Sequence, residues 1–274
     1  MIKKPINKKK KKKVVIKKKK LSKISIVPKK TTTIKKKSIN VAFEFRKIDF
    51  KNNNVRYISG IDPSLSSTGI SVYDIINKKY YADSIRINKD ICLCEGDRYG
   101  RVADGVCNKL SEWGLGDFTN TICFMEQPSA AFGGGFVQIN VLEFIGVIKE
   151  KLARNFLIVP IMVPSPTVKG FHQLGNLKNK DKKEYTRKLN EKFIHDGVVF
   201  NNDDEGDSFL VMKIAKVFYD GNIDGLSSNQ IKVLYKDRDK IIYQTLNAEE
   251  KTAWNKDHKK DKDDKDEKGE DNGE

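Results

Sequence analysis

The chain has 274 residues, enough for one complete hydrophobic core, so its fold requires no disulfide scaffold. Its 53 lysines and arginines outnumber 37 acidic residues, which gives a formal net charge of +16. The excess is confined to residues 1–37, which hold 18 lysines and no acidic residue, whereas residues 38–248 are nearly neutral.

The sequence argues against a membrane-spanning or secreted protein. No apolar run approaches the roughly 18 residues that cross a bilayer, and lysines stand where a secretory signal has its apolar core. The cysteines form no CxxC pair and have no histidine at zinc-ligand spacing; they are Cys92, Cys94, Cys107 and Cys123. We expect a reduced, intracellular protein, cytoplasmic and within a host cell if viral. The lysine runs also leave nuclear or mitochondrial import open.

Residues 1–40 and 257–274 are predicted to be disordered, charged tails. In the first tail, unbroken lysine runs repel one another and oppose packing. These lysines can also neutralise backbone phosphates, which would supply salt-dependent affinity for nucleic acid. A solvated extension or a nuclear-import signal explains the runs equally well. In the second tail, lysines alternate with acidic residues, a composition typical of disorder.

Between the tails, residues 55–220 show the pattern of one α/β domain. In chain order, the expected elements are strands at 57–61, 69–75 and 80–87, a helix at 98–113, a strand at 121–125, a helix at 136–153, a strand at 156–163, and helices at 180–194 and 204–219. The first three strands are joined by short turns, which predicts an antiparallel meander. The whole order predicts a mixed five-stranded sheet flanked by helices, parallel where strands and helices alternate. Residues 221–256 are predicted to be a helical C-terminal extension without a defined place.

Carboxylates stand at the ends of several expected elements. Asp62 directly follows the first strand, and Glu126 directly follows the fourth. Ligand sites of α/β sheets gather at the carboxyl ends of strands, so these two side chains are expected to lie close together. Asp204 and Asp207 are three residues apart at the start of a helix and share one face of its first turn. Singly, each residue is also explained as a turn former, a surface residue or a helix N-cap.

Four carboxylates at close range cannot all stay ionised without a positive charge between them. A divalent metal ion supplies that charge, and hard oxygen ligands without His or Cys favour Mg²⁺, with Mn²⁺ as the alternative. Two such ions about 3.5 to 4 Å apart form the arrangement that serves phosphodiester hydrolysis. We therefore expect Asp62, Glu126, Asp204 and Asp207 to hold two metal ions per active site, with no small-molecule cofactor.

Three segments together resemble the acidic motifs of the RuvC-type Holliday-junction resolvases, especially the phage or viral members. They are residues 60–69 (GIDPSLSSTG), 125–128 (MEQP) and 203–208 (DDEGDS), in the order and roughly the spacing of that family. The resemblance implies an RNase H-like fold, a homodimer, and Mg²⁺-dependent paired nicks in four-way DNA junctions. It also implies that the four carboxylates named above bind the metal. The family usually has alanine in place of Gly206 and lacks the long lysine tail.

The resemblance also implies roles for basic and aromatic residues. In the family, a lysine preceding a helix contacts the scissile phosphate; Lys183 is the best match for this catalytic role, and Lys182 is nearly as good. Phe132 stands where the family places an aromatic wedge between junction bases. The full set of expected DNA contacts is Lys169, Lys178, Lys180, Lys182 and Phe132. Solvated lysines and a packed phenylalanine are the alternatives.

The function expected from these features is a structure-selective endonuclease that resolves four-way DNA junctions. One alternative is a less selective RNase H-like nuclease that cuts flaps, forks or RNA–DNA hybrids. Another is a non-catalytic binding protein whose lysine tail holds nucleic acid. A third is a sugar-kinase or actin-like ATPase, because Asp62 and the Ser/Thr/Gly-rich turn after it also resemble a phosphate-binding hairpin. That interpretation needs a second phosphate loop, for which 133–135 is the candidate.

Overall fold

The computed structural model describes residues 54–115, 121–128, 136–175 and 177–255. The predicted tails, 1–40 and 257–274, lie outside this part of the chain, as do Phe132 and the glycines of 133–135. None of the described helices is long and apolar enough to cross a membrane.

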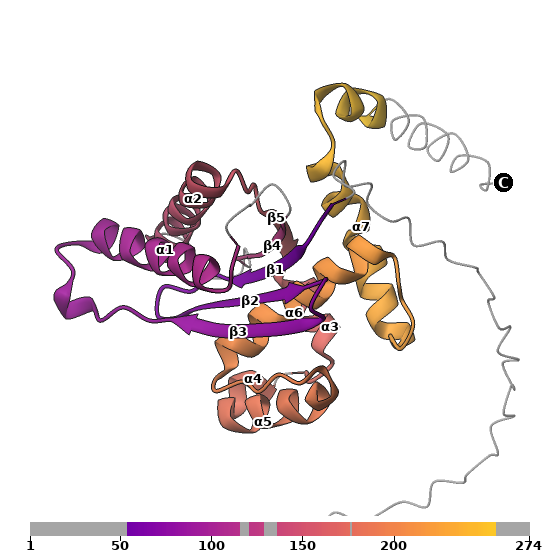
Figure 1. Cartoon of the computed structure of the whole chain (residues 1–274), viewed down its shortest axis with the longest axis horizontal. Helices are drawn as coiled ribbons and strands as arrows, with labels where there is room; N and C mark the ends of the chain where they lie inside the picture. Colours follow the sequence, from indigo (N-terminus) through magenta and orange to yellow (C-terminus); the bar gives the residue numbers. More distant parts are fainter. Residues whose placement is uncertain (1–53, 116–120, 129–135, 176, 256–274) are drawn as a thin grey trace, which may run out of the picture. The chain divides into compact units, whose positions relative to one another are not determined.

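Five strands form one mixed sheet in the order β3-β2-β1-β4-β5 (Figure 1). Their bounds are β1 (Tyr57–Asp62), β2 (Thr68–Asp74), β3 (Lys79–Ile85), β4 (Thr121–Gln127) and β5 (Ile161–Pro164). The first three strands pair antiparallel, while β4 is parallel to β1 and β5 is parallel to β4. The predicted fold class, a mixed five-stranded sheet flanked by helices, is confirmed by this order and pairing.

Helices cover both faces of the sheet (Figure 1). On one face lie α1 (Glu95–Glu112) and α2 (Phe136–Phe156). On the other lie α3 (Ser165–His172), α4 (Leu177–Lys180), α5 (Lys182–Lys192), α6 (Asp203–Asp220) and α7 (Ser228–Thr245). Each face has its own apolar core: Val106 and Phe144 belong to the first, and Phe209 and Phe218 to the second. The three-layer arrangement therefore buries the central strands on both sides.

Two glycines allow α6 to lie directly on the sheet. A Cβ atom at Gly60 of β1 would stand 2.3 Å from the backbone nitrogen of Met212 and from the carbonyl oxygen of Ser208. A Cβ atom at Gly69 of β2 would stand 1.9 Å from the carbonyl oxygen of Asp204. Only glycine permits backbone-to-backbone approach this close. The first turns of α6, which carry the acidic run, are thereby held against β1 and β2.

The structure corrects the predicted elements between β4 and α5. The helix after β4 continues to Phe156, so the predicted strand at 156–163 is wrong for its first half, and β5 begins only at Ile161. After β5 the chain enters α3 directly, with Pro164 as its N-cap and Pro166 in its first turn. In the segment predicted to be helical but left without a place, α7 packs against α3 and β5 and contributes Leu234 and Ile241 to the core.

Candidate metal and nucleic-acid site

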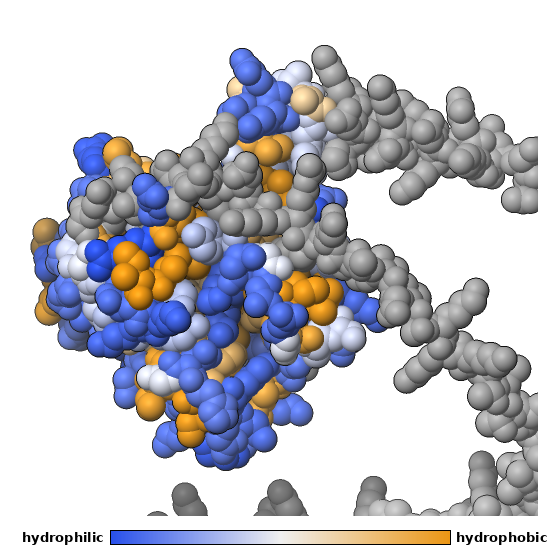
Figure 2. Space-filling view, turned by 45° about the vertical axis from the view of Figure 1, so that its right-hand side comes forward, coloured by the Kyte–Doolittle hydropathy of each residue, from blue (hydrophilic) through white to orange (hydrophobic). Residues whose placement is uncertain are grey.

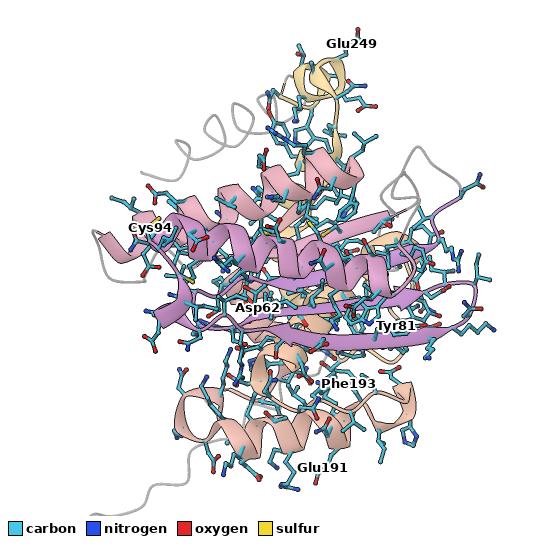
Figure 3. All side chains as sticks on the ribbon, turned by 60° about the vertical axis from the view of Figure 1, so that its left-hand side comes forward. Asp62, Tyr81, Cys94, Glu191, Phe193 and Glu249 are labelled. Carbon is cyan, nitrogen blue, oxygen red and sulfur yellow. The ribbon has the colours of Figure 1, made fainter. Side chains whose placement is uncertain are left out.

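Asp62 and Glu126 project from the same face of the sheet, the one that α6 covers. Side chains alternate between faces along a strand, so Asp62 shares the face of Ile58, and Glu126 shares that of Phe124. Ile58 and Phe124 both belong to the core on the α6 side. Since β1 and β4 are parallel neighbours, both carboxylates lie at the same end of the sheet, as predicted. Figure 3 shows Asp62 at the level of the sheet with helices on either side.

Helix α6 adds its acidic residues to this end of the sheet. The helix is capped by Asn202, whose side chain accepts a hydrogen bond from the backbone nitrogen of Glu205 at 3.0 Å. In the first two turns of α6, Asp204 and Asp207 contact different residues. Asp204 lies 3.5 Å from the guanidinium of Arg86 at the end of β3. Asp207 accepts a 2.5 Å hydrogen bond from the hydroxyl of Tyr185 on α5.

The pKa values show that these carboxyl groups interact electrostatically. Burial, followed by the charges of Glu126 and Asp207, raises the pKa of Asp62 well above its usual range. Burial also raises the pKa of Glu126 to about 7, and Asp207 contributes to that rise. The pKa of Asp204 is raised by burial as well. Like charges held together away from water cause this pattern.

Lys178 supplies a positive charge within the acidic group. Its ammonium contacts the carboxylate of Asp207 and lies 3.8 Å from Asp203 Oδ2. Burial disfavours its charged form, but the carboxylates of Asp207 and Asp62 outweigh burial and raise the pKa of Lys178. The sequence pointed to Lys178 only as a DNA contact, whereas the structure places it among the predicted metal ligands.

The donor set suits a hard divalent cation. Three elements supply only carboxylate oxygens, and Lys178 partly relieves their repulsion, which is the chemistry that Mg²⁺ or Mn²⁺ matches. Within the described ranges, no three acidic, histidine or cysteine side chains are already arranged to hold a metal ion. The carboxylates of Asp62, Glu126, Asp204 and Asp207 are therefore neighbours that would have to turn toward one another to bind a metal. Their role as ligands stays a prediction.

The remaining predicted lysines are distributed around the acidic group. Lys182, at the start of α5, lies 2.8 Å from Asp203 Oδ2. Lys183 is exposed and lines a neighbouring hollow rather than contacting the acids. Lys180 is also exposed. Lys169 is exposed on α3, near enough to Glu126 for its charge to lower the pKa of that group. Lys182 and Lys178, rather than Lys183, thus face the acids.

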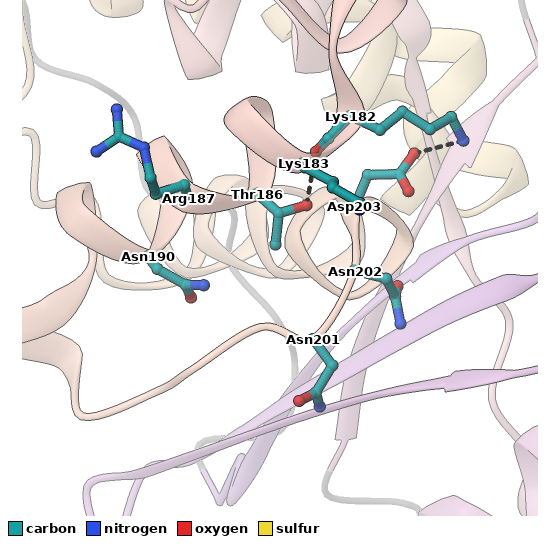
Figure 4. A pocket seen from close by; sticks show the side chains of 8 residues that line it. All are labelled: Lys182, Lys183, Thr186, Arg187, Asn190, Asn201, Asn202 and Asp203. Atoms are coloured by element: carbon teal, nitrogen blue, oxygen red, sulfur yellow. Dashed lines mark hydrogen bonds and ion pairs between the residues drawn. The ribbon is translucent and has the colours of Figure 1, made fainter.

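A basic and amide-lined hollow of about 400 Å³ lies beside the acidic group (Figure 4). Its lining residues come from α5 and from the start of α6: Lys182, Lys183, Thr186, Arg187, Asn190, Asn201, Asn202 and Asp203. The side-chain amide of Asn190 donates a hydrogen bond to the carbonyl oxygen of Phe200 and accepts one from its backbone nitrogen. The surface around α4 and α5, lowest in Figures 1 and 2, is mostly hydrophilic. Lysines at its rim are placed to meet an anionic ligand.

Three residues at this site were not predicted from the sequence. Asp203 is 5% exposed and pairs with Lys182, yet it stood in the sequence only as part of an acidic run. Tyr185 is fully buried, and its apolar position in α5 is typical of an ordinary core residue. Arg86 follows β3, and nothing in its neighbourhood in the sequence connects it with α6. Each depends on contacts between elements that are distant along the chain.

Comparison with known proteins adds only weak similarities. No protein-family model matches the chain, and no curated protein matches it. Thermus thermophilus RuvC in complex with a Holliday junction substrate is similar at 12% identity and a TM-score of 0.42, covering 60% of this chain and 94% of that chain. Another Thermus thermophilus RuvC structure is similar at 14% identity and a TM-score of 0.43, covering 60% of this chain and 95% of that chain. At such identity and TM-score, the similarity is no basis for assigning an activity.

Proposed function

We propose that this protein is a divalent-metal-dependent endonuclease that cuts branched DNA, with four-way junctions as its preferred substrate. Asp62, Glu126, Asp204 and Asp207 would hold the metal ions, Mg²⁺ or Mn²⁺. When bound, such ions lower the pKa of the attacking water and neutralise charge on the leaving oxygen. The preference for junctions, and action as a homodimer, rest on the resemblance of the three acidic segments to the RuvC-type resolvases.

The observation that carries the proposal is the meeting of carboxylates from β1, β4 and α6 at one end of the sheet, around Lys178. Burial and mutual repulsion raise the pKa of Asp62 and of Glu126 there, so the folded chain keeps acids together at a cost in free energy. Strongly shifted pKa values gathered in one group are typical of functional sites, and a bound metal ion would relieve this repulsion. The chain's own residues then have separate tasks: the carboxylates hold the metal, while Lys182 and Lys169 receive backbone phosphates.

The test is cleavage of a synthetic four-way junction in Mg²⁺ by wild type and Asp62→Asn. Wild type is expected to make paired nicks, and Asp62→Asn to bind the junction but lose more than about 100-fold in cutting rate, because even outer partners of a metal site are worth about 10- to 100-fold. Asp104→Asn, a half-exposed carboxylate on α1 paired with Lys151, is the matched control and should cut normally. Equal cutting by Asp62→Asn would overturn the assignment.

A substrate panel separates the preferred substrate from its alternatives. Flaps, forks, linear duplex and RNA–DNA hybrids are compared with the junction at equal ionic strength. Stronger cutting of flaps, forks or hybrids would replace the junction resolvase with a less selective nuclease, while Asp62→Asn would still be inactive. Binding of all substrates without cutting of any would favour the non-catalytic alternative.

A further inference from the structure

Lys178 holds a position that differs from that of every other lysine near the site. It belongs to α4, a single turn between α3 and α5, and its side chain is 33% exposed. The ammonium contacts Asp207, lies 3.8 Å from Asp203, and acts on Asp62 through its charge. Lys182 reaches Asp203 from outside and is 67% exposed.

The partner of Lys178 is itself held in place. The hydroxyl of Tyr185 donates to Asp207 Oδ1, while Lys178 contacts Asp207 Oδ2. One carboxylate oxygen therefore has a neutral, fully buried partner, and the other has a charged partner on a flexible stem. Lysine is a compact point charge with rotatable bonds along four methylene groups, so its ammonium can leave without movement of the helix.

We propose that Lys178 is the internal counter-ion of the carboxylate group: its ammonium neutralises Asp207 and Asp62 while no metal is bound, and it leaves Asp207 Oδ2 when a divalent metal binds. The inference rests on the proposed metal site and adds a competitor to it. The ammonium of Lys178 and a metal ion from solution would compete for Asp207 Oδ2. Lys178 then sets how tightly the site takes metal, a role separate from contact with DNA.

The test measures metal binding rather than activity. Lys178→Met keeps the length and the apolar stem but removes the charge, and the full-length protein is titrated with MgCl₂ and with MnCl₂ by calorimetry at fixed ionic strength. Loss of the competing cation is expected to tighten metal binding about tenfold, within the usual range of coupling between two charged ligands at one site. Lys178→Arg, which keeps the charge, should bind metal nearly as wild type does. Lys188→Met, a half-exposed lysine of α5 outside the acidic group, is the control and should leave affinity unchanged.

Thermal unfolding gives a second measurement on the same variants. Without metal, Lys178→Met should unfold at a lower temperature than wild type, because the carboxylates lose their counter-charge. With saturating Mg²⁺ the gap should close. Unchanged or weaker metal binding by Lys178→Met, or an unchanged melting temperature without metal, would overturn the inference while leaving the metal site intact. Absence of any metal binding by wild type would overturn the metal site and the inference together.

Discussion

The two oxygens of the Asp207 carboxylate have unlike surroundings, and this difference says which of them can exchange partners. Oδ1 takes its hydrogen bond from Tyr185, whose ring is buried against His172 and whose position is set by α5. Oδ2 contacts the ammonium of Lys178. Orientation is thus fixed through one oxygen, and the other is left to whichever cation is present. In metal sites, the residues that bind the metal are commonly oriented by hydrogen bonds from neighbouring groups in this way.

Glu126 makes stability depend on pH in a direction opposite to that of a salt-bridged acid. Its pKa is about 7 instead of the ordinary 4.5, so the folded state holds its proton between these values and the unfolded state does not. Folding is then progressively disfavoured as pH rises from about 4.5 to about 7. In metal-free buffer, the melting temperature of wild type should fall across this range, and that of Glu126→Gln should fall less.

The control for this experiment is Glu143→Gln, an exposed acid on α2, whose pH profile should follow that of wild type. Mg²⁺ competes with the proton on Glu126, so metal affinity should rise as pH increases through about 7. Parallel melting profiles for wild type and Glu126→Gln would contradict the buried, proton-holding state of this side chain.

At this scale, the sequence predicted the residues that depend on the period of a strand and missed those that depend on packing. Asp62 and Glu126 each end a strand, so strand alternation and parallel pairing place them together. Tyr185 and Arg86 reach the acids only because α5 and β3 approach α6 in three dimensions. Their neighbours along the chain carry no sign of this approach. The choice between Lys182 and Lys183 depends likewise on the rotation of α5, which the sequence leaves open.

Among the elements, α6 depends on the two glycines beneath it. Gly60 and Gly69 have no side chains that would hold the helix away from β1 and β2. A Cβ atom at either position would lie closer to the backbone of α6 than Cβ atoms lie to other atoms in proteins. Gly206, on the helix itself, faces Leu189 Cδ1, which a Cβ would approach to 2.4 Å. Alanine at this position would require the flexible end of Leu189 to move. Glycine here thus fits the packing of α5 on α6.

Gly69→Ala should destabilise the fold and separate Asp204 from Asp62. The new methyl group would meet the carbonyl oxygen of Asp204, a backbone atom that cannot rotate away, so we expect a loss of about 3 kcal/mol in the free energy of unfolding. Denaturant unfolding measures this loss. Gly146→Ala, in α2 with nothing within 4 Å of the new methyl, is the control and should be neutral or slightly stabilising. Similar stabilities of the two variants would contradict direct contact between α6 and β2.

The elements that the sequence predicted well are those with their own local signals. The meander of β1, β2 and β3 is marked by short apolar runs and turns, and α1 by apolar residues at helical spacing. In contrast, α3 is short and begins at prolines, which are also typical of loops. Helix α7 has few apolar residues, and its place becomes evident only through its contacts: buried Asp237 accepts a hydrogen bond from Thr167 of α3. The periodicity of apolar residues does not predict such contacts between elements that are distant along the chain.

At the scale of the whole molecule, charge is divided between a nearly neutral domain and a lysine-rich start. Carboxylates from β1, β4 and α6 lie near Lys178 in the domain, while the 18 lysines of residues 1–37 are suited to general attraction to nucleic acid. Binding strength and cleavage chemistry are therefore expected to be separable parts of the chain.

Deletion of residues 1–40 tests this separation. Affinity for junction DNA should fall and become less dependent on salt, by about 0.9 in the slope of log K against log salt for each phosphate that the lysines no longer neutralise. Cleavage at low salt should persist. Loss of both binding and cleavage at low salt would instead contradict the separation and show that cleavage depends on the tail. The measurements are fluorescence anisotropy across a salt series and a cleavage assay on the same junction.

The outer strand β5 has a neighbour that is not a strand. The side-chain amide of Gln244 in α7 accepts a 2.8 Å hydrogen bond from the backbone nitrogen of Met162 and donates a 2.9 Å hydrogen bond to its carbonyl oxygen. The unpaired edge of a strand can pair with a strand of another chain. Here the side chain of Gln244 forms hydrogen bonds of the kind that a neighbouring strand would form. Helix α7 thus occupies the outer edge of β5 at Met162, which leaves that backbone less available for pairing with a strand of another chain.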